Sequence, residues 1–113
     1  MTPEKVVQHN LEAYNARDIQ AFISDYAEDI ELYSFGNNQP TAKGLSEVKE
    51  IYANLFDASP NLNSTIINRI VFENKVIDHE SITGRMGKKD LVEMVLIYEI
   101  KDDKIFKITA IKK

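Results

Sequence analysis

The sequence predicts an α+β fold in which three N-terminal helices precede a curved, mostly antiparallel sheet. Apolar residues recur at helical spacing up to residue 59, and from residue 64 onward apolar and polar residues alternate with a period of two. Short turn signals separate the strand candidates. The chain has 113 residues, which is enough for one core, so we assign residues 1–113 to a single domain. Helices that precede a meandering sheet are expected to pack on one of its faces.

Capping residues and apolar stripes define the three helices. Thr2 can cap the first helix, and Pro3 suits its first turn. Asp18 can cap a second helix over residues 19–29, and a third is expected over residues 45–59, where Pro60 ends it. The inward stripes are Val6, Val7, Leu11 and Tyr14 in the first helix, Phe22, Ile23 and Tyr26 in the second, and Val48, Ile51, Tyr52, Leu55 and Phe56 in the third.

Five strands are expected. A short one covers residues 30–34 and leads into a loop over residues 35–44, which is rich in Gly, Asn and Pro. The other four are expected over residues 64–73, 75–84, 91–100 and 104–113. Two-residue turns at Asn74–Lys75 and Asp102–Asp103 would join the first and last pairs of this group.

Composition argues against several classes of function. The net charge is −4 and the lysines are scattered, which disfavours binding to nucleic acid. No apolar run is long enough to cross a membrane, and no hydrophobic signal region opens the chain, so we expect a cytoplasmic protein. There is no cysteine, and the two histidines are far apart, so no metal site is expected. No glycine-rich phosphate loop is present, and no cofactor is expected.

Three adjacent titratable residues, Asp78, His79 and Glu80, lie within the strand candidate over residues 75–84. Because side chains alternate along a strand, Asp78 and Glu80 share one face and His79 takes the other. The three residues therefore cannot form one compact group, and a Ser-His-Asp arrangement through Ser34 or Ser81 has no local support.

Four stretches, "VVQHNLEAYNARDIQAF", "YAEDIELYSF", "KGLSEVKEIYANLF" and "KVIDHESITG", resemble in this order the nuclear transport factor 2-like superfamily. Within it the chain is most similar to the SnoaL-like and ketosteroid-isomerase-like proteins. The resemblance covers nearly the whole chain. It implies a cone-shaped barrel wrapped around the helices and a homodimer through the outer sheet face. It does not imply one activity, because members include isomerases, cyclases, hydrolases, dehydratases and binding modules.

The catalytic residues of ketosteroid isomerases, which the resemblance would imply, are not retained in this sequence. An ungapped overlay places Asn10 where those enzymes have a tyrosine, Ser34 where they have the aspartate base, and Leu96 where they have the oxyanion-binding aspartic acid. Tyr52 of "IYANLF" keeps the supporting tyrosine position. The resemblance thus favours the fold and argues against that mechanism.

The same overlay places Asp78 and Glu80 inside the cone, with His79 outside. Two carboxyl groups in an apolar pocket are candidate proton-transfer groups, because burial and mutual repulsion raise pKa values. With a turn at Asn74–Lys75, Arg69 would lie directly across from Glu80 and orient it. The expected ligand contacts are Asn10, Tyr14, Ser34, Tyr52, Phe56, Arg69 and Leu96.

Three functions remain open. The chain could catalyse acid–base chemistry on a small apolar or aromatic ligand through Asp78 and Glu80, or bind such a ligand without turnover. Alternatively, its sheet face could bind a protein while side chains fill the cone. For most of these residues a structural role is the alternative: an exposed Arg69–Glu80 pair would be surface decoration, and the tyrosines would be core.

Overall fold

The computed structural model describes residues 1–113 and contains three α-helices, α1 (Pro3–Ala16), α2 (Ile19–Ile23) and α3 (Leu45–Asp57). As expected, the Thr2 hydroxyl caps α1 by accepting from the backbone N–H of Lys5, and the Asp18 carboxylate caps α2 by accepting from Ala21. A 3₁₀ turn, η1 (Arg85–Gly87), interrupts the second half of the chain.

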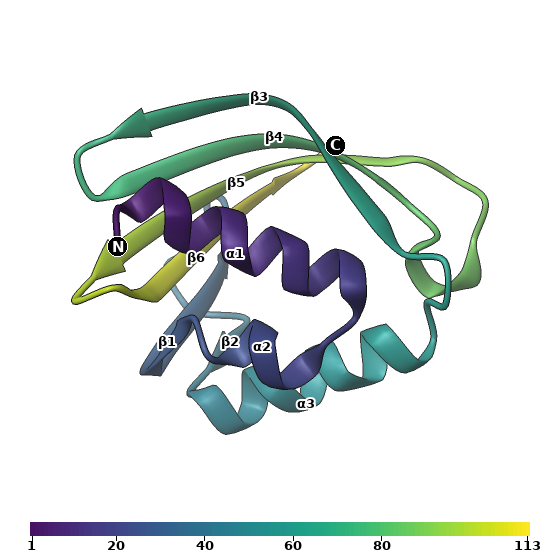
Figure 1. Ribbon diagram of the computed structural model, residues 1–113, viewed down its shortest axis with the longest axis horizontal. Helices are drawn as coiled ribbons and strands as arrows, with labels where there is room; N and C mark the ends of the chain where they lie inside the picture. The colour runs from purple at the N-terminus through teal and green to yellow at the C-terminus, as the bar shows by residue number, and fades with distance from the viewer.

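Six strands form one sheet in the order β2-β1-β6-β5-β4-β3. They are β1 (Tyr26–Ser34), β2 (Ala42–Lys43), β3 (Asn63–Phe72), β4 (Lys75–Thr83), β5 (Val92–Lys101) and β6 (Lys104–Lys112). The last four form an antiparallel meander, and β1 joins β6 in parallel. The sheet curves over the helices, which all lie on its concave side (Figure 1). This is the predicted α+β cone, although the sheet is open between β2 and β3 rather than closed into a barrel.

Two predicted boundaries are wrong. The second helix ends at Ile23 instead of residue 29, and β1 begins at Tyr26 instead of Ile30. The cause is a long-range contact, because the backbone N–H of Ile105 in β6 donates to the carbonyl of Asp25 at 2.8 Å and draws the next residue into the sheet. Within the predicted loop, Ala42 and Lys43 form the short edge strand β2.

The two hairpin turns differ in outcome. Asp102 and Asp103 both have positive φ values, as a tight two-residue turn requires, and this turn is confirmed. The other turn lies at Glu73–Asn74 and not at Asn74–Lys75, because Phe72 pairs with Lys75.

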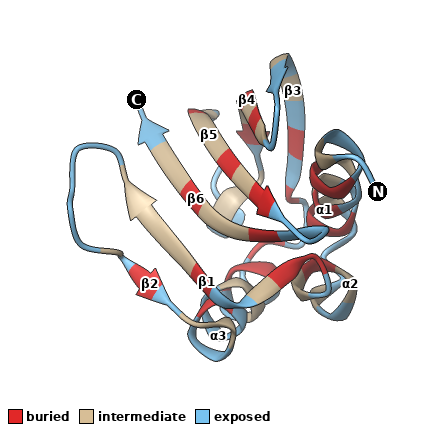
Figure 2. Cartoon of the chain, turned by 90° about the vertical axis from the view of Figure 1, so that its left-hand side faces the viewer, coloured by how far each residue is buried: buried red, intermediate tan, exposed pale blue.

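The core lies between the concave sheet face and the helices, where nineteen buried apolar side chains form one cluster (Figure 2). Phe35, which follows β1, lies outside this core and is 66% exposed. None of the helices combines the length and apolar character needed to cross a membrane.

Candidate functional site

A cavity of about 430 Å³ opens between the concave sheet face and the helices. This volume is typical of sites for small organic ligands. The walls are mainly apolar; Met94 and Leu96 of β5 line the sheet side, and Ile51 and Leu55 of α3 line the opposite side. A cone filled by side chains would have favoured a module that only binds proteins. The cavity is open, so this observation does not favour such a module.

Glu80 is the acidic residue that lines this cavity. Strand alternation in β4 turns it inward, where its side chain is buried. Its Oε1 atom accepts a hydrogen bond from the Ser64 hydroxyl at 2.6 Å, and Oε2 accepts a longer one from the Tyr98 hydroxyl at 3.4 Å. Burial raises the pKa of Glu80 from 4.5 to about 6, and the negative charge of Asp78 adds to this, while the two hydrogen bonds and Arg69 act in the opposite direction. The carboxyl group can therefore gain or lose a proton near neutral pH.

Asp78 also faces inward, as predicted, but it does not line the cavity. The Arg69 guanidinium binds its carboxylate through two hydrogen bonds, from Nε to Oδ1 at 2.6 Å and from Nη2 to Oδ2 at 2.9 Å. Arg69 Nη1 donates in turn to Gln8 of α1 at 2.9 Å. Asp78 and Arg69 thus form a buried ion pair that ties the edge of the sheet to the first helix.

The predicted pairing of Arg69 with Glu80 is wrong. In the hairpin, Arg69 lies opposite Asp78, and Glu80 lies opposite Ile66. Two shifts combine to cause this: the turn falls one residue earlier than predicted, and a β-bulge at Ile67 adds an extra residue to β3. The bulge also turns Ser64 inward, and its hydroxyl takes the position beside Glu80.

Asn10 lines the cavity and is part of a buried network that the sequence did not predict as a whole. Its amide nitrogen donates to the carbonyl of Phe22 at 2.9 Å, and its amide oxygen accepts from the Tyr26 hydroxyl at 3.3 Å. Behind it, the Asp25 carboxylate is buried and lies 2.7 Å from Nδ1 of His9. The His9 side chain is 47% exposed and makes this contact at the surface.

Tyr14 and Tyr52 both line the cavity. Burial raises the pKa of both, and the positive charge of Arg85 lowers it. The Tyr14 hydroxyl is buried without a hydrogen-bond partner in the protein. Phe56, also predicted as a contact, does not line the cavity; it packs behind the wall, with ring centroids 5.7 Å from Tyr14 and 5.3 Å from Phe22.

Ser34 and Leu96 both line the cavity, on β1 and β5 respectively. Neither side chain is an acid or a base. By the resemblance, Ser34 stands where ketosteroid isomerases have their base, and Leu96 stands where they have the oxyanion-binding acid. The outward His79 donates a hydrogen bond to Glu93 on the outer sheet face, and so takes no part in the cavity.

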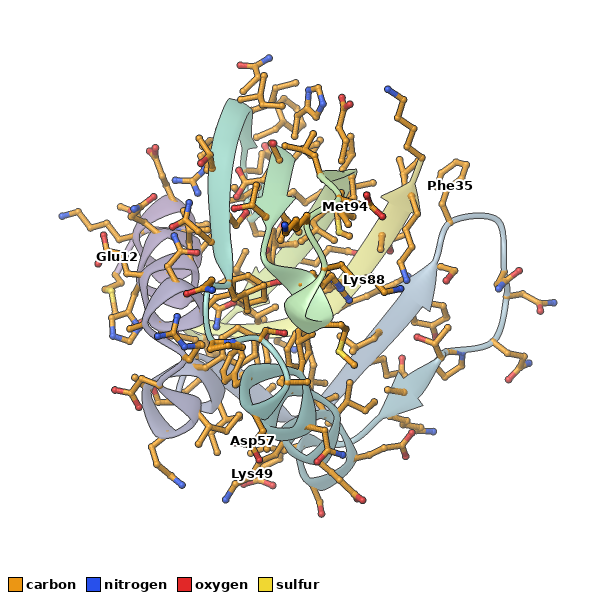
Figure 3. The ribbon with its side chains drawn as sticks, turned by 90° about the vertical axis from the view of Figure 1, so that its right-hand side faces the viewer. Glu12, Phe35, Lys49, Asp57, Lys88 and Met94 are labelled. Carbon is orange, nitrogen blue, oxygen red and sulfur yellow. The ribbon has the colours of Figure 1, made fainter.

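Arg85 and Lys112 line the cavity, and sequence reasoning missed both. Arg85 lies on η1, a turn that contacts Ser59 just after the C-terminal end of α3 through the N–H of Met86. Figure 3 shows this turn between the sheet and α3. Glycines bracket this turn in "TGRMGKK", and that pattern was the available signal. Gly84 is required there, because a Cβ atom would lie 2.3 Å from the carbonyl oxygen of Asn61.

Comparisons with known proteins agree on the fold. Residues 7–108 match the family model of the SnoaL-like domain. No curated protein matches the chain in sequence. Three crystal structures illustrate the structural likeness. An uncharacterized cystatin-fold protein from Novosphingobium aromaticivorans superposes with a TM-score of 0.89 at 18% identity, covering 99% of each chain.

The second structure is a SnoaL-like protein of unknown function from Burkholderia thailandensis, with a TM-score of 0.79 at 19% identity over 98% of this chain and 93% of that one. The third is a protein with a ketosteroid isomerase-like fold from Catenulispora acidiphila, in complex with trimethylamine. Its TM-score is 0.78 at 18% identity, over 97% and 85% of the two chains. At these identities the likeness concerns the fold alone.

Proposed function

Because the chain belongs to the SnoaL-like family, we propose that its cavity binds a small, largely apolar organic molecule and that Glu80 transfers a proton to or from it. The family alone does not define a reaction. The observation that carries the proposal is a buried carboxyl group that faces an apolar cavity and has its pKa raised to about 6. Such a group suits general acid–base catalysis near neutral pH.

The surrounding groups fit proton transfer next to an oxygen atom. As a carboxylate, Glu80 would remove a proton from a carbon beside a carbonyl group; as a carboxylic acid, it would protonate an oxygen. Tyr52 lines the same cavity, and its hydroxyl can donate a hydrogen bond to the oxygen on which negative charge develops. Isomerisation, cyclisation and hydration all include such a step.

In this proposal Asp78 acts on Glu80 through its charge. Its carboxylate is held by Arg69, and the negative charge raises the pKa of Glu80, whereas the positive charge of Arg69 lowers it. The ion pair therefore adjusts the acidity of Glu80 from behind the cavity wall and does not touch the ligand. Asn10, Ser34 and Leu96 supply the shape and remaining contacts of the site.

The test uses 1-tetralone, an apolar aromatic ketone, and follows by proton NMR the exchange of its C2 protons for deuterium in D₂O. We expect the wild type to accelerate exchange, with a rate that rises through about pH 6 as Glu80 ionises. Glu80→Gln keeps the shape but has no basic oxygen, and should lower the rate about 100-fold or more. Glu93→Gln, on the outer sheet face, is the matched control. Equal rates for wild type and Glu80→Gln would exclude Glu80 as the base.

A second candidate function is ligand binding without turnover. It is favoured by the hydrogen bonds from Ser64 and Tyr98, which occupy both oxygens of Glu80. In that case 1-tetralone would bind to wild type and to Glu80→Gln, and neither would accelerate exchange.

We also propose a homodimer through the outer sheet face. Apolar side chains from four strands share this face; they are Ile70, Ile77, Val95, Ile97 and Ile111. Ile70 is 53% exposed and Ile111 is 37% exposed, a large apolar patch for a free surface. A neighbouring row of alternating charge, Lys75, Glu99, Lys107 and Glu31, can pair with its own copy across a two-fold axis.

A further inference from the structure

We propose that the cavity selects an organic anion, a largely apolar molecule whose one anionic group is held by Arg85 and Lys112 while its neutral, reacting part lies beside Glu80. This inference rests on the proposed function and specifies its class of ligand. The supporting observations are the charges of the lining residues, the unpaired state of the two cations, and the buried hydroxyl beside Arg85.

The charge of the cavity is opposite to that of the protein. The chain carries a net charge of −4, yet the charged residues that line the cavity are Glu80, Arg85 and Lys112. The lining therefore carries a net positive charge even when Glu80 is ionised. A net positive lining in a protein of negative net charge favours anionic over neutral or cationic ligands at this cavity.

Arg85 and Lys112 have no acidic partner within the protein. Neither side chain makes a salt bridge, whereas Arg69, Lys107 and Lys113 are each paired with a carboxylate. Arg85 as a whole residue is also half-buried. A planar guanidinium in such a position is well suited to bind a carboxylate or another oxyanion through two parallel hydrogen bonds.

The turn that carries Arg85 is fixed in place. The backbone N–H of Met86 donates to the hydroxyl of Ser59 at 2.8 Å, and Ser59 itself is fully buried. On the other side of Arg85, Gly84 lies so close to the Asn61 carbonyl that no side chain fits. These contacts hold the backbone of Arg85 against the end of α3, so the point from which its side chain extends is fixed before a ligand arrives.

The Tyr14 hydroxyl completes the anion site. Tyr14 is 9% exposed, lines the cavity, and its hydroxyl has no hydrogen-bond partner in the protein. Arg85 lies close enough to lower the pKa of Tyr14 without forming a well-aligned hydrogen bond to it. An anionic oxygen between the two groups would accept from both the hydroxyl and the guanidinium, and would satisfy a buried donor that is otherwise unpaired.

Tyr52 lines the cavity together with Glu80 and Arg85. Arg85 lowers the pKa of Tyr52 and Glu80 raises it, so the Tyr52 hydroxyl lies within reach of both charges. A ligand anion placed beside Glu80 would be repelled by its carboxylate. The favourable orientation therefore puts the anion at Arg85 and a neutral group, such as a carbonyl, at the Glu80 end.

Two fluorescent probes with the same aromatic body test this proposal: 8-anilinonaphthalene-1-sulfonate, an anion, and N-phenyl-1-naphthylamine, which is neutral. We expect wild type to bind both and Arg85→Gln to weaken the sulfonate probe about tenfold, while the Kd of the neutral probe changes less than about twofold. Lys88→Gln, an exposed cation on the same loop that does not line the cavity, should leave both Kd values unchanged. Added salt should weaken only the sulfonate probe.

Each other outcome has a distinct meaning. Equal affinity of wild type and Arg85→Gln for the sulfonate probe would overturn the anion site and leave the proposed function standing. The same holds if Arg85→Gln weakens both probes alike, because the residue would then act on the shape of the cavity. If wild type binds neither probe, the open apolar cavity itself is refuted, and the proposed function falls with it.

Discussion

Arg69→Gln should be among the most destabilising single substitutions in this protein. The Asp78 carboxylate is 1% exposed, and both of its hydrogen bonds come from Arg69, whose side chain is 13% exposed. Removing the guanidinium leaves a buried charge with no partner, because the residue paired with Asp78 on β5 is Leu96. Breaking a buried ion pair in this way costs about 3–5 kcal/mol of the free energy of unfolding.

That loss is a large part of the roughly 5–15 kcal/mol that stabilises a typical domain. For a chain of this size it corresponds to a fall in Tm of about 12–20 °C. Urea unfolding at pH 7, followed by circular dichroism, measures the change directly. Asp78→Asn in the Arg69→Gln background should restore part of the lost stability, because it removes the unpaired charge.

The control is Lys43→Gln. Its ammonium lies 3.9 Å from Glu31 and its side chain is 73% exposed, so this pair should contribute less than about 1 kcal/mol. A loss for Arg69→Gln as small as that of Lys43→Gln would refute the reasoning. It would show that water reaches Asp78, and that its charge does not act on Glu80 through a dry interior.

Three further predictions concern the site and the outer face. The pKa of Glu80 is higher in the folded state than its ordinary value, so its contribution to stability is fully present below about pH 4.5 and is lost as pH rises through about 6. Over this range wild type should lose about 2 kcal/mol of unfolding free energy relative to Glu80→Gln. Urea unfolding at several pH values measures this difference, and parallel pH curves for the two proteins would contradict it. Tyr14→Phe removes an unpaired hydroxyl and should leave the free energy of unfolding unchanged or raise it by up to about 1 kcal/mol. Tyr26→Phe leaves the amide oxygen of Asn10 without a hydrogen-bond donor and should lower the free energy of unfolding. An equal loss for the two variants would mean that the Tyr14 hydroxyl has a partner. Ile77→Lys should shift the protein from dimer to monomer in analytical ultracentrifugation, and an unchanged mass would place the interface elsewhere.

The fold was largely predictable because most of its elements carry a local signal. The caps at Thr2 and Asp18 and the change of period after Pro60 depend on neighbouring residues alone, and the structure confirms them. The end of α2 carries no such signal, because Tyr26 follows Phe22 at helical spacing. Its strand conformation depends on β6, which lies almost eighty residues further along the chain.

The site was predicted less completely. The inward direction of Glu80 follows from strand alternation, and the structure confirms it. The partner of Glu80 depends on the register of the hairpin. Because the turn is displaced and β3 contains one bulge, Ser64 lies beside Glu80 in place of the predicted Arg69. Arg85 lies on an irregular turn with no periodicity, so only tertiary contacts place it at the cavity.

The central claim is that Glu80 is an acid–base group in a dry cavity, and an NMR titration of its side-chain carboxyl carbon tests this most directly. We predict a midpoint near pH 6, since burial is the largest effect on its pKa. Glu93 serves as an internal reference, because hydrogen bonds from His79 and Lys113 lower its pKa. A midpoint for Glu80 near its ordinary value of 4.5 would show a solvated carboxylate and contradict the proposed acid–base role.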